Sequence, residues 1–436
     1  MTTAGLARRL VERHFATRDG ELVLGGVSVR ELAERFGTPL YVYDATVMRA
    51  QLGRLREAIP ARVEVFFSVK ANPNVDVLRV FVGEGAGLEI ASASEYLRAR
   101  AAGCAPDRIV FAGPGKGREE LARVIEGGVG EIHLESEEEI ALVDALAGEE
   151  GRRVRVALRV NPRAAGGAMQ MGGQSAPFGF DEERLEEVAR LVLRHPRLDL
   201  VGLHLYGGTQ MLRAEVVVAQ WEATVRLGLA LAQVLGRPLE SLDFGGGLGV
   251  PYFGKETELD LAAVQRGLGE KVGPTLGDPA LAGARLVVEP GRFLVGPAGV
   301  YVTGVRAVKT SRGKTYVVTD GGMHHHLAAS GNLGQVIKKD YPLVHGTRAF
   351  APEALLAVVT GPLCTPLDTI GRAVELPETR AGDLVCVLQS GAYGLSASPV
   401  GFLSHPMPAE VLVGDGEPRV VRSRGTFEEP LVGLPG

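Results

Sequence analysis

Short apolar runs alternate with segments of helical periodicity over the first two thirds of the chain. Eight of these runs predict β-strands, and a lead-in strand, LYVYD, precedes them at residues 40–44. Between the runs, apolar residues recur at helical spacing, as in residues 181–195. The eight strands are expected at residues 63–69, 87–91, 108–112, 131–135, 154–160, 200–206, 241–245 and 285–289.

Two of the intervening helices carry the same start signal. Ser92 is followed three residues later by Glu95, and Ser136 by Glu139. In a capping box with this spacing, the serine oxygen accepts a backbone N–H and the glutamate returns a second bond to the helix start. We therefore expect helices to begin directly after Ser92 and Ser136.

Eight strands alternating with helices over about 230 residues predict an α/β fold with a (β/α)8 TIM barrel. A doubly wound sheet stays open as an alternative, because periodicity alone does not separate the two. After Arg292 the pattern changes to alternating strands without clear long helices, which indicates a C-terminal β-sandwich or β-barrel domain. The predicted strands are the runs YVTGVRAV, TYVVTD, LLAVVT, DLVCVL, AEVLV and RVVRSR. We expect residues 38–292 to form the barrel, and residues 1–37 and 293–436 to form the β domain.

Composition narrows the class of protein. The chain has 436 residues and a net charge of −5, whereas a general nucleic-acid binder would usually be basic. Charged residues interrupt every apolar run at the N-terminus, and no run reaches about 18 apolar residues, so we expect neither a signal peptide nor a membrane span. Cys104, Cys364 and Cys386 are too few and dispersed for a disulfide framework, which fits a cytoplasmic protein.

The carboxyl ends of the expected strands carry polar residues, where a barrel places its chemistry. Lys70 lies in the apolar stretch FFSVKANPN, and burying an ammonium there without a purpose would be costly. A lysine amine in such a setting can form a Schiff base with a carbonyl cofactor, commonly pyridoxal 5′-phosphate. The strand-end set is Lys70, Glu135, Asn161, Tyr206, Gly245 to Gly247 and Glu289.

Such a cofactor needs a phosphate site and a partner for its ring nitrogen. The segment FGGGLG at 244–249 offers backbone N–H groups near a helix start, although glycine-rich loops are common and weak evidence alone. Glu289, in EPGR, would pair with the pyridine nitrogen and keep it protonated, which makes the ring a strong electron sink.

Together, nine motifs resemble the fold-type III pyridoxal-phosphate decarboxylases, the group of ornithine and diaminopimelate decarboxylases with an alanine-racemase-like barrel. The resemblance spans about Leu40 to Val413. Its motifs are FFSVKANPN, LEIASASE (88–95), FAGPGK (111–116), LES (134–136), RVNP (159–162), FGGGLGVPYF (244–253), EPGRF (289–293), GPLCTPLD (361–368) and SGAYG (390–394).

The resemblance implies roles for individual residues. Lys70 would hold the cofactor as a Schiff base, and Glu289 would face the pyridine nitrogen. Tyr206 stands where many relatives have a histidine stacked on the ring. Cys364 would reach the site from a partner subunit and protonate the carbanion after CO2 leaves, which implies a homodimer with shared active sites. The remaining cofactor-binding residues would be Glu89 and Gly291, with Gly245, Gly246, Gly247, Arg292 and Tyr393 on the phosphate.

The family pattern breaks where relatives recognise the distal end of the substrate. Ornithine and diaminopimelate enzymes have an acidic residue after the motif cysteine, whereas this chain has Thr365. The segment 320–343 also lacks the Arg-Pro that binds a distal carboxylate. A diamine substrate would lose its counter-charge. We expect substrate contacts from Thr365 and Asp368 instead.

Three consecutive histidines, His324 to His326, stand in this same recognition segment. On a strand, His324 and His326 would share one face and His325 the other. Three consecutive residues seldom converge on one metal ion, so no metal site is expected. We expect His324 and His326 to contact substrate, and the alternative is that one or two simply pack or form hydrogen bonds.

Four stretches resemble a narrower branch of the family. They are 320–330, QMGGQSAPFGFDE (170–182), 361–368 and 382–406. The branch contains aminoacyl-carrier-protein decarboxylases, such as the L-glutamyl-carrier-protein decarboxylase of butirosin biosynthesis, and exosortase-associated decarboxylases. In the carrier type, the distal carboxylate is a thioester, so no distal charge remains to be neutralised.

Three hypotheses follow. The first is an α-decarboxylase of a glutamyl- or aspartyl-like amino acid tethered to an acyl carrier protein. The second is a decarboxylase of a free amino acid such as meso-diaminopimelate. The third is a non-catalytic cofactor-binding regulator, which the presence of Lys70, Glu289 and Cys364 disfavours. Lys338 and Lys339 could face an acidic carrier, but we interpret them as an ordinary solvated pair.

Overall fold

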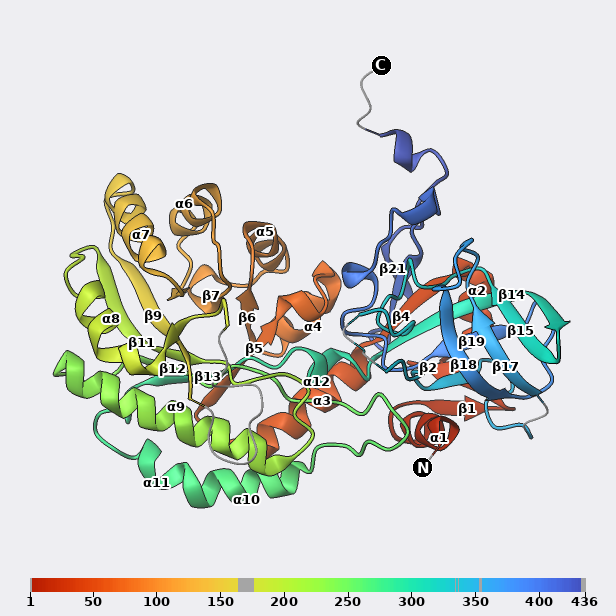
Figure 1. Cartoon of the computed structure of the whole chain (residues 1–436), viewed down its shortest axis with the longest axis horizontal. Helices are drawn as coiled ribbons and strands as arrows, with labels where there is room; N and C mark the ends of the chain where they lie inside the picture. The colour runs from red at the N-terminus through yellow and green to blue at the C-terminus, as the bar shows by residue number, and fades with distance from the viewer. Residues whose placement is uncertain (1, 164–175, 334, 336, 353–354, 433–436) are drawn as a thin grey trace. The chain divides into compact units, whose positions relative to one another are not determined.

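The computed structural model describes residues 2–163, 176–333, 335, 337–352 and 355–432 (Figure 1). The chain forms two compact units, which we call the barrel unit and the β unit. The barrel unit comprises Gln51–Val250 and Glu258–Phe293. The β unit comprises Met1–Ala50, Pro251–Thr257 and Leu294–Gly436.

Eight parallel strands form the barrel unit, and every expected strand is present. Each strand pairs with the next, and β13 pairs with β5 through Leu286 and Val63, which closes the sheet. A doubly wound sheet is excluded because these strands leave no open edge. The strands are β5 (Val63–Ser68), β6 (Gly87–Ile90), β7 (Ile109–Phe111), β8 (Glu131–Leu134), β9 (Val154–Asn161), β11 (Leu198–Leu205), β12 (Ser241–Asp243) and β13 (Arg285–Val288). A two-residue strand, β10 (Phe180–Asp181), adds to β9.

Helices connect the strands, and both predicted helix starts are confirmed. Ser92 Oγ accepts the Glu95 N–H and Ser136 Oγ accepts the Glu139 N–H, each at 3.2 Å. The two glutamates bond one residue further upstream than a capping box would, to the backbone N–H of Ala91 and of Glu135. The helices are α3 (Ala45–Ala58), α4 (Val75–Gly83), α5 (Ala93–Ala101), α6 (Arg118–Glu126), α7 (Glu137–Glu149), α8 (Leu185–Val192), α9 (Ala214–Leu235), α10 (Leu261–Lys271), α11 (Gly273–Leu276) and α12 (Arg292–Val295).

The β unit is built on a large mixed sheet in the order β18-β17-β15-β14-β4-β20-β21, with β19 and β16 branching from β14. The six alternating runs expected after Arg292 each form a strand, and the expected lead-in run LYVYD forms β4. The three-residue strand β16 and the glycine-interrupted β18 were not expected. The strands are β4 (Leu40–Asp44), β14 (Gly299–Ser311), β15 (Lys314–Thr319), β16 (Leu343–His345), β17 (Leu355–Thr360), β18 (Thr369–Leu376), β19 (Leu384–Val387), β20 (Ala409–Val413) and β21 (Arg419–Arg422).

The unit boundaries differ from the expected ones at two places. The lead-in strand β4 pairs antiparallel with β14 and parallel with β20, so it belongs to the β unit, which extends to residue 50 rather than 37. Residues 251–257 also belong to the β unit. The run LYVYD is buried throughout, and a continuously buried strand carries no mark of which sheet it joins.

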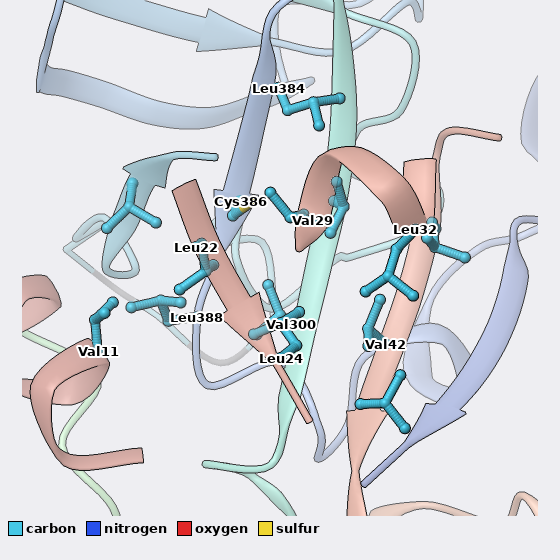
Figure 2. Packing of buried hydrophobic residues seen from close by; sticks show 14 of the residues in the cluster. Val11, Leu22, Leu24, Val29, Leu32, Val42, Val300, Leu384, Cys386 and Leu388 are labelled. Carbon is cyan, nitrogen blue, oxygen red and sulfur yellow. The ribbon is translucent and has the colours of Figure 1, made fainter. Parts of the chain in front are cut away.

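The N-terminal segment completes the core of the β unit, as Figure 2 shows. Val11, Leu22 and Leu32 pack in one buried cluster with Val300 and Cys386, and each of these side chains is at most 1% exposed. Burying an aliphatic side chain of this size contributes about 1.5–3 kcal/mol, so these residues help hold the unit together. Val11, Leu22 and Leu32 come from α1 (Thr3–His14), β2 (Glu21–Leu24) and α2 (Val29–Phe36), which lie in sequence beside β1 (Ala16–Arg18) and β3 (Val27–Ser28), whereas Val300 and Cys386 belong to β14 and β19.

Within the described residues, no helix is both long and apolar enough to cross a membrane. Cys104 and Cys386 are buried, whereas Cys364 is exposed.

Candidate active site

The carboxyl ends of the barrel strands carry the expected polar residues. Lys70 lies in a single 3-10 turn, Val69–Ala71, immediately after β5. Glu135 follows β8, Tyr206 follows β11 and Glu289 follows β13. Because parallel strands in a closed barrel end on one face, these four residues share that face.

Lys70 is held by a carboxylate on the neighbouring strand. Its Nζ lies 2.8 Å from Glu89 Oε2 and 2.9 Å from Glu89 Oε1. The Glu89 side chain is 1% exposed, whereas that of Lys70 is 44% exposed. Ser68 Oγ donates a further hydrogen bond to Glu89. The buried Glu89 carboxylate thus holds the Lys70 amine in place, while the lysine side chain remains accessible to solvent.

Glu289 has one occupied and one unpaired carboxylate oxygen. Its Oε2 lies 3.2 Å from His204 Nε2, while Oε1 is buried without a hydrogen-bond partner among the described residues. Burial alone would raise the pKa of Glu289, but His204 outweighs it and holds that pKa below its ordinary range. An ionised, buried oxygen without a partner is suited to a cationic N–H donor from a ligand.

A second polar layer lies deeper in the barrel, and the sequence analysis missed it. The ring of His133 packs 4.4 Å from that of His204, with 35° between their planes. His133 Nε2 lies 3.2 Å from Glu131 Oε1, and Asp243 Oδ1 accepts the Gly245 N–H at 2.7 Å. Burial, followed by the charge of Glu289, raises the pKa of Asp243.

The signal for this layer was present in the strand pattern. In EIHL, Glu131 and His133 alternate with apolar residues, so both polar side chains point to the same face of β8. Donor atoms of His133, His204 and Glu289 lie within 4.8 Å of one another, a spacing that metal ligands share. The rings of His133 and His204 pack against each other, and His204 lies at ion-pair distance from Glu289, so we interpret the trio as a packed electrostatic cluster.

The backbone of the glycine loop after β12 packs directly against the backbone of the neighbouring strand ends. A Cβ on Gly245 would lie 2.4 Å from the Leu205 carbonyl oxygen, and one on Gly246 would lie 2.2 Å from the Glu289 carbonyl oxygen. Gly245 and Gly247 have φ of +63° and +96°, which other residues rarely adopt. The loop can therefore present its backbone closely to an anion only because it lacks side chains.

Two residues of the EPGR turn adjoin the lysine and glycine segments. A Cβ on Gly291 would lie 2.8 Å from Ala71 Cβ, so glycine is required where this turn packs against the Lys70 turn. Arg292 Nη2 lies 3.5 Å from Thr209 Oγ1, in the loop that follows β11. A cationic group is thus close to the glycine loop.

Tyr206 lies near a fixed guanidinium group. Arg159 Cζ is 5.8 Å from the centre of the Tyr206 ring, and Arg159 Nη1 is 2.8 Å from Glu135 Oε1. Burial would raise the pKa of Glu135, but Arg159 and Lys116 outweigh it and lower that pKa. Glu135 is therefore an anchor for Arg159.

In the β unit, Cys364 lies on the exposed loop between β17 and β18. The expected substrate residue Asp368 is only 2% exposed. Its oxygens accept the Met323 N–H at 2.6 Å and the Leu363 N–H at 2.9 Å, and burial raises its pKa. Asp368 thus shapes the loop, and its contact with substrate stays a prediction.

The three histidines do not lie on a strand, because residues 323–325 and 327–333 form turns. All three rings are at most 1% exposed. His326 Nε2 lies 3.0 Å from Ser390 Oγ, and His325 Nδ1 lies 3.2 Å from Tyr301 Oη. Neither ring nitrogen of His324 has a described partner. Turn formation lets consecutive side chains enter one core, which strand alternation would forbid.

Burial keeps these histidines neutral. It lowers the pKa of His324 to about 4, of His325 to about 2 and of His326 to about 3. Substrate contact by His324 and His326 stays a prediction. Tyr393 lies in the turn segment after β19 with a φ of +52°, and its phosphate role likewise stays a prediction. Residues 170–175 of the branch motif lie outside the described residues.

The fold and the barrel site together define a barrel enzyme that binds pyridoxal 5′-phosphate. An accessible amine, an unpaired buried carboxylate oxygen and a side-chain-free loop beside an arginine match the aldehyde, ring nitrogen and phosphate of that cofactor.

Comparison with known proteins gives the family. Residues 45–296 match the family model described as "Pyridoxal-dependent decarboxylase, pyridoxal binding domain". The chain is 39% identical to the L-glutamyl-[BtrI acyl-carrier protein] decarboxylase of Niallia circulans, over 93% of this chain and 96% of that protein. It is 32% identical to the diaminopimelate decarboxylase of Aquifex aeolicus (strain VF5), over 94% and 95%. The diaminopimelate decarboxylase structure from M. jannaschi superposes with a TM-score of 0.88 at 25% identity, over 97% and 98%.

The chain therefore belongs to the pyridoxal-dependent decarboxylase family. It is a carboxy-lyase that uses pyridoxal 5′-phosphate to decarboxylate an amino acid.

Proposed function

We propose that this decarboxylase acts on a glutamyl- or aspartyl-like amino acid tethered as a thioester to an acyl carrier protein. One observation carries the proposal. In the loop 361–369, the motif cysteine is followed by Thr365, and the only carboxylate of the loop, Asp368, is buried and bonded to backbone N–H groups. The loop therefore offers no counter-charge for a distal ammonium, whereas a neutral thioester needs none.

The 39% identical relative is named as acting on a glutamyl group of the BtrI acyl-carrier protein, which supports this reading. The second candidate function is decarboxylation of free diaminopimelate. It is supported by the 32% sequence identity to the diaminopimelate decarboxylase of Aquifex aeolicus. That alternative requires some other group to neutralise the distal ammonium.

Bound pyridoxal phosphate supplies an electron-withdrawing ring for the electron pair left when CO2 departs. Lys70 Nζ would hold the cofactor through its aldehyde, and Glu89 keeps that amine at the rim of the barrel. Glu289 Oε1 would accept a hydrogen bond from the ring nitrogen, while His204 lies beside Oε2 of the same carboxylate. The glycine loop and Arg292 would bind the phosphate, and Tyr206 would pack against the ring.

Cys364 Sγ gives a proton to the substrate Cα after CO2 has left. We propose that this Cys364 belongs to the partner subunit of a homodimer with shared active sites. The exposed position of the Cys364 loop supports this role, since a buried thiol could not serve a site outside its own unit.

The experiment measures CO2 release by the cofactor-loaded protein. Substrates are free glutamate, aspartate, lysine, ornithine and diaminopimelate, beside glutamyl and aspartyl thioesters of the BtrI acyl-carrier protein. Lys70→Ala protein is the control for non-enzymatic release. Release from a carrier thioester alone supports the proposal. Equal turnover of the free amino acid and its thioester would contradict it, and brisk release from free diaminopimelate would establish the second candidate.

A further inference from the structure

A groove of about 650 Å³ crosses one face of the β unit. Its floor is formed by side chains from β14, β15 and β17. Lys309 pairs with Tyr316, and Tyr316 with Val358, while Val318 pairs with Thr360. Directly paired residues point to the same face of a sheet, so these side chains form one continuous surface. The loop Gly361 to Thr369 contributes one wall.

The charged groups of the groove are almost all cationic. Lys309, Lys314 and Lys338 are exposed, and none forms an ion pair with a described carboxylate. Arg372 also lines the groove, but its Nη1 is paired with Asp340 Oδ1 at 2.9 Å. Among the described residues that line the groove, Asp368 is the only acidic one, and its oxygens are bonded to the backbone.

This local excess of positive charge contrasts with the chain as a whole, which carries −5. Basic side chains gathered without counter-charges on an acidic protein raise the local concentration of anionic ligands and speed their association. A purely structural surface of an acidic protein would more often intersperse acids among its lysines. The groove is therefore suited to an anionic partner.

The groove is continuous with the loop that carries Cys364. Thr365, Pro366 and Leu367 line it, and Cys364 is the preceding, exposed residue. Between Lys314 and Val318, strand β15 extends for about 13 Å at 3.3 Å per residue. The lysines of the β14–β15 hairpin and the Cys364 loop thus mark two parts of one elongated surface.

We infer that this groove receives the phosphopantetheine arm of an acidic carrier protein, with the lysines facing the phosphodiester and the acidic surface of the carrier. This inference rests on the proposed function. The floor supplies Tyr316 and Val318, with Leu363 and Leu367 at the loop, against which an arm of alkyl and amide groups can pack. Lys338 is then part of a binding surface rather than an ordinary solvated residue.

The test compares the holoenzyme with two double variants. Lys309→Glu/Lys314→Glu reverses the groove charge. Arg194→Glu/Arg266→Glu makes the same net change at exposed sites of the barrel unit and is the control. Each protein is assayed for CO2 release from the glutamyl thioester of the BtrI acyl-carrier protein and from the glutamyl thioester of N-acetylcysteamine. Binding of fluorescently labelled phosphopantetheinylated BtrI carrier is measured separately by anisotropy.

In the groove variant, KM for the carrier thioester and Kd for the carrier should each rise about tenfold or more at low salt, with kcat retained. The small thioester should be processed as by the wild type, which shows that the site is intact. The control should match the wild type with both substrates. In the wild type, added salt should weaken carrier binding, because exposed charges are screened within about 10 Å at 0.1 M salt.

The outcomes separate the two proposals. Turnover of the carrier thioester with equal KM in the wild type and the groove variant would overturn the groove and leave the proposed function standing. Carrier binding that depends on the groove, without CO2 release from the carrier thioester, would support the groove and overturn the proposed function. A wild-type holoenzyme that neither binds the carrier nor acts on its thioester would overturn both.

Discussion

His204 Nε2 lies 3.2 Å from Glu289 Oε2 at the centre of the barrel, and the other oxygen of Glu289 has no described partner. The histidine thus occupies one side of the carboxylate and leaves the other side for a ligand. Since Glu289 owes its lowered pKa mainly to His204 once burial is overcome, the two residues form one functional unit in which His204 is a positioning residue.

Replacing His204 with phenylalanine should therefore raise the pKa of Glu289 and lower kcat about 10- to 100-fold, because removing one partner of this buried ion pair is expected to weaken transition-state stabilisation by roughly 1.4–2.7 kcal/mol. KM should change less. The measurement is the pH profile of kcat, together with the absorption spectrum of the bound cofactor, which a merely structural role would not move.

His204→Gln retains an N–H donor and is the matched control. It should recover a large part of kcat. If phenylalanine and glutamine variants have the same pH profile and spectrum as the wild type, His204 does not act through Glu289.

Mixing two inactive variants should restore activity if active sites are shared between subunits. Lys70→Ala removes the nucleophile, and activity should fall roughly 10³-fold or more. Cys364→Ala removes the proton donor that each subunit would supply to the active site of its partner. After random exchange, half of the dimers are mixed and each has one intact site, so about a quarter of wild-type activity should return.

The check is CO2 release before and after co-refolding or prolonged mixing, with each variant alone as the control. No recovery, under conditions where subunit exchange is demonstrated by mass-tagged chains, would show that Lys70 and Cys364 serve sites within one chain.

Thr365 should limit which free amino acids are accepted. Thr365→Glu adds a carboxylate to the loop after Cys364, where Asp368 is already bonded to backbone. We expect kcat/KM for free lysine or ornithine to rise up to about fivefold, since an ion pair at such a position contributes up to about 1 kcal/mol. Turnover of a neutral thioester should not improve.

Steady-state kinetics on both substrate types give this comparison, with Thr365→Gln as the uncharged control of the same size. An equal gain from glutamine would attribute the effect to side-chain size rather than to charge.

Acid should destabilise the protein through its buried histidines. Burial lowers the pKa of His324 to about 4, below the roughly 6.5 of an unfolded histidine. The unfolded chain therefore binds this proton first, so stability is complete above pH ~6.5 and falls as the pH drops toward 4. The loss is up to about 1.4 kcal/mol per pH unit for each such histidine.

His324→Phe should match or exceed wild-type stability at pH 7.5, because neither ring nitrogen has a described partner to lose. Between pH 6 and 4.5 its stability should fall less steeply. Urea unfolding midpoints across this range provide the measurement, with His14→Phe on helix α1 as the control at a partly exposed position. Parallel pH curves for the wild type and His324→Phe would show that His324 does not titrate on unfolding.

The sequence alone specified the barrel strands and the residues at their ends. Period-two and period-3.6 patterns are local, and each strand of the barrel begins and ends within a few residues of its apolar run. Lys70 and Glu289 were found because polar residues at the ends of buried strands stand out against their surroundings. The family resemblance added the roles that no local pattern encodes.

Only the tertiary structure decided which distant segments meet. It placed β4 in the β unit through pairing with β14 and β20, and it folded His324 to His326 into turns inside a core. It joined Glu131, His133 and His204 in the barrel interior, and it gathered Lys309, Lys314 and Lys338 around one groove. Local periodicity shows which face of an element is buried, whereas pairing across long stretches of chain depends on packing that one segment does not contain.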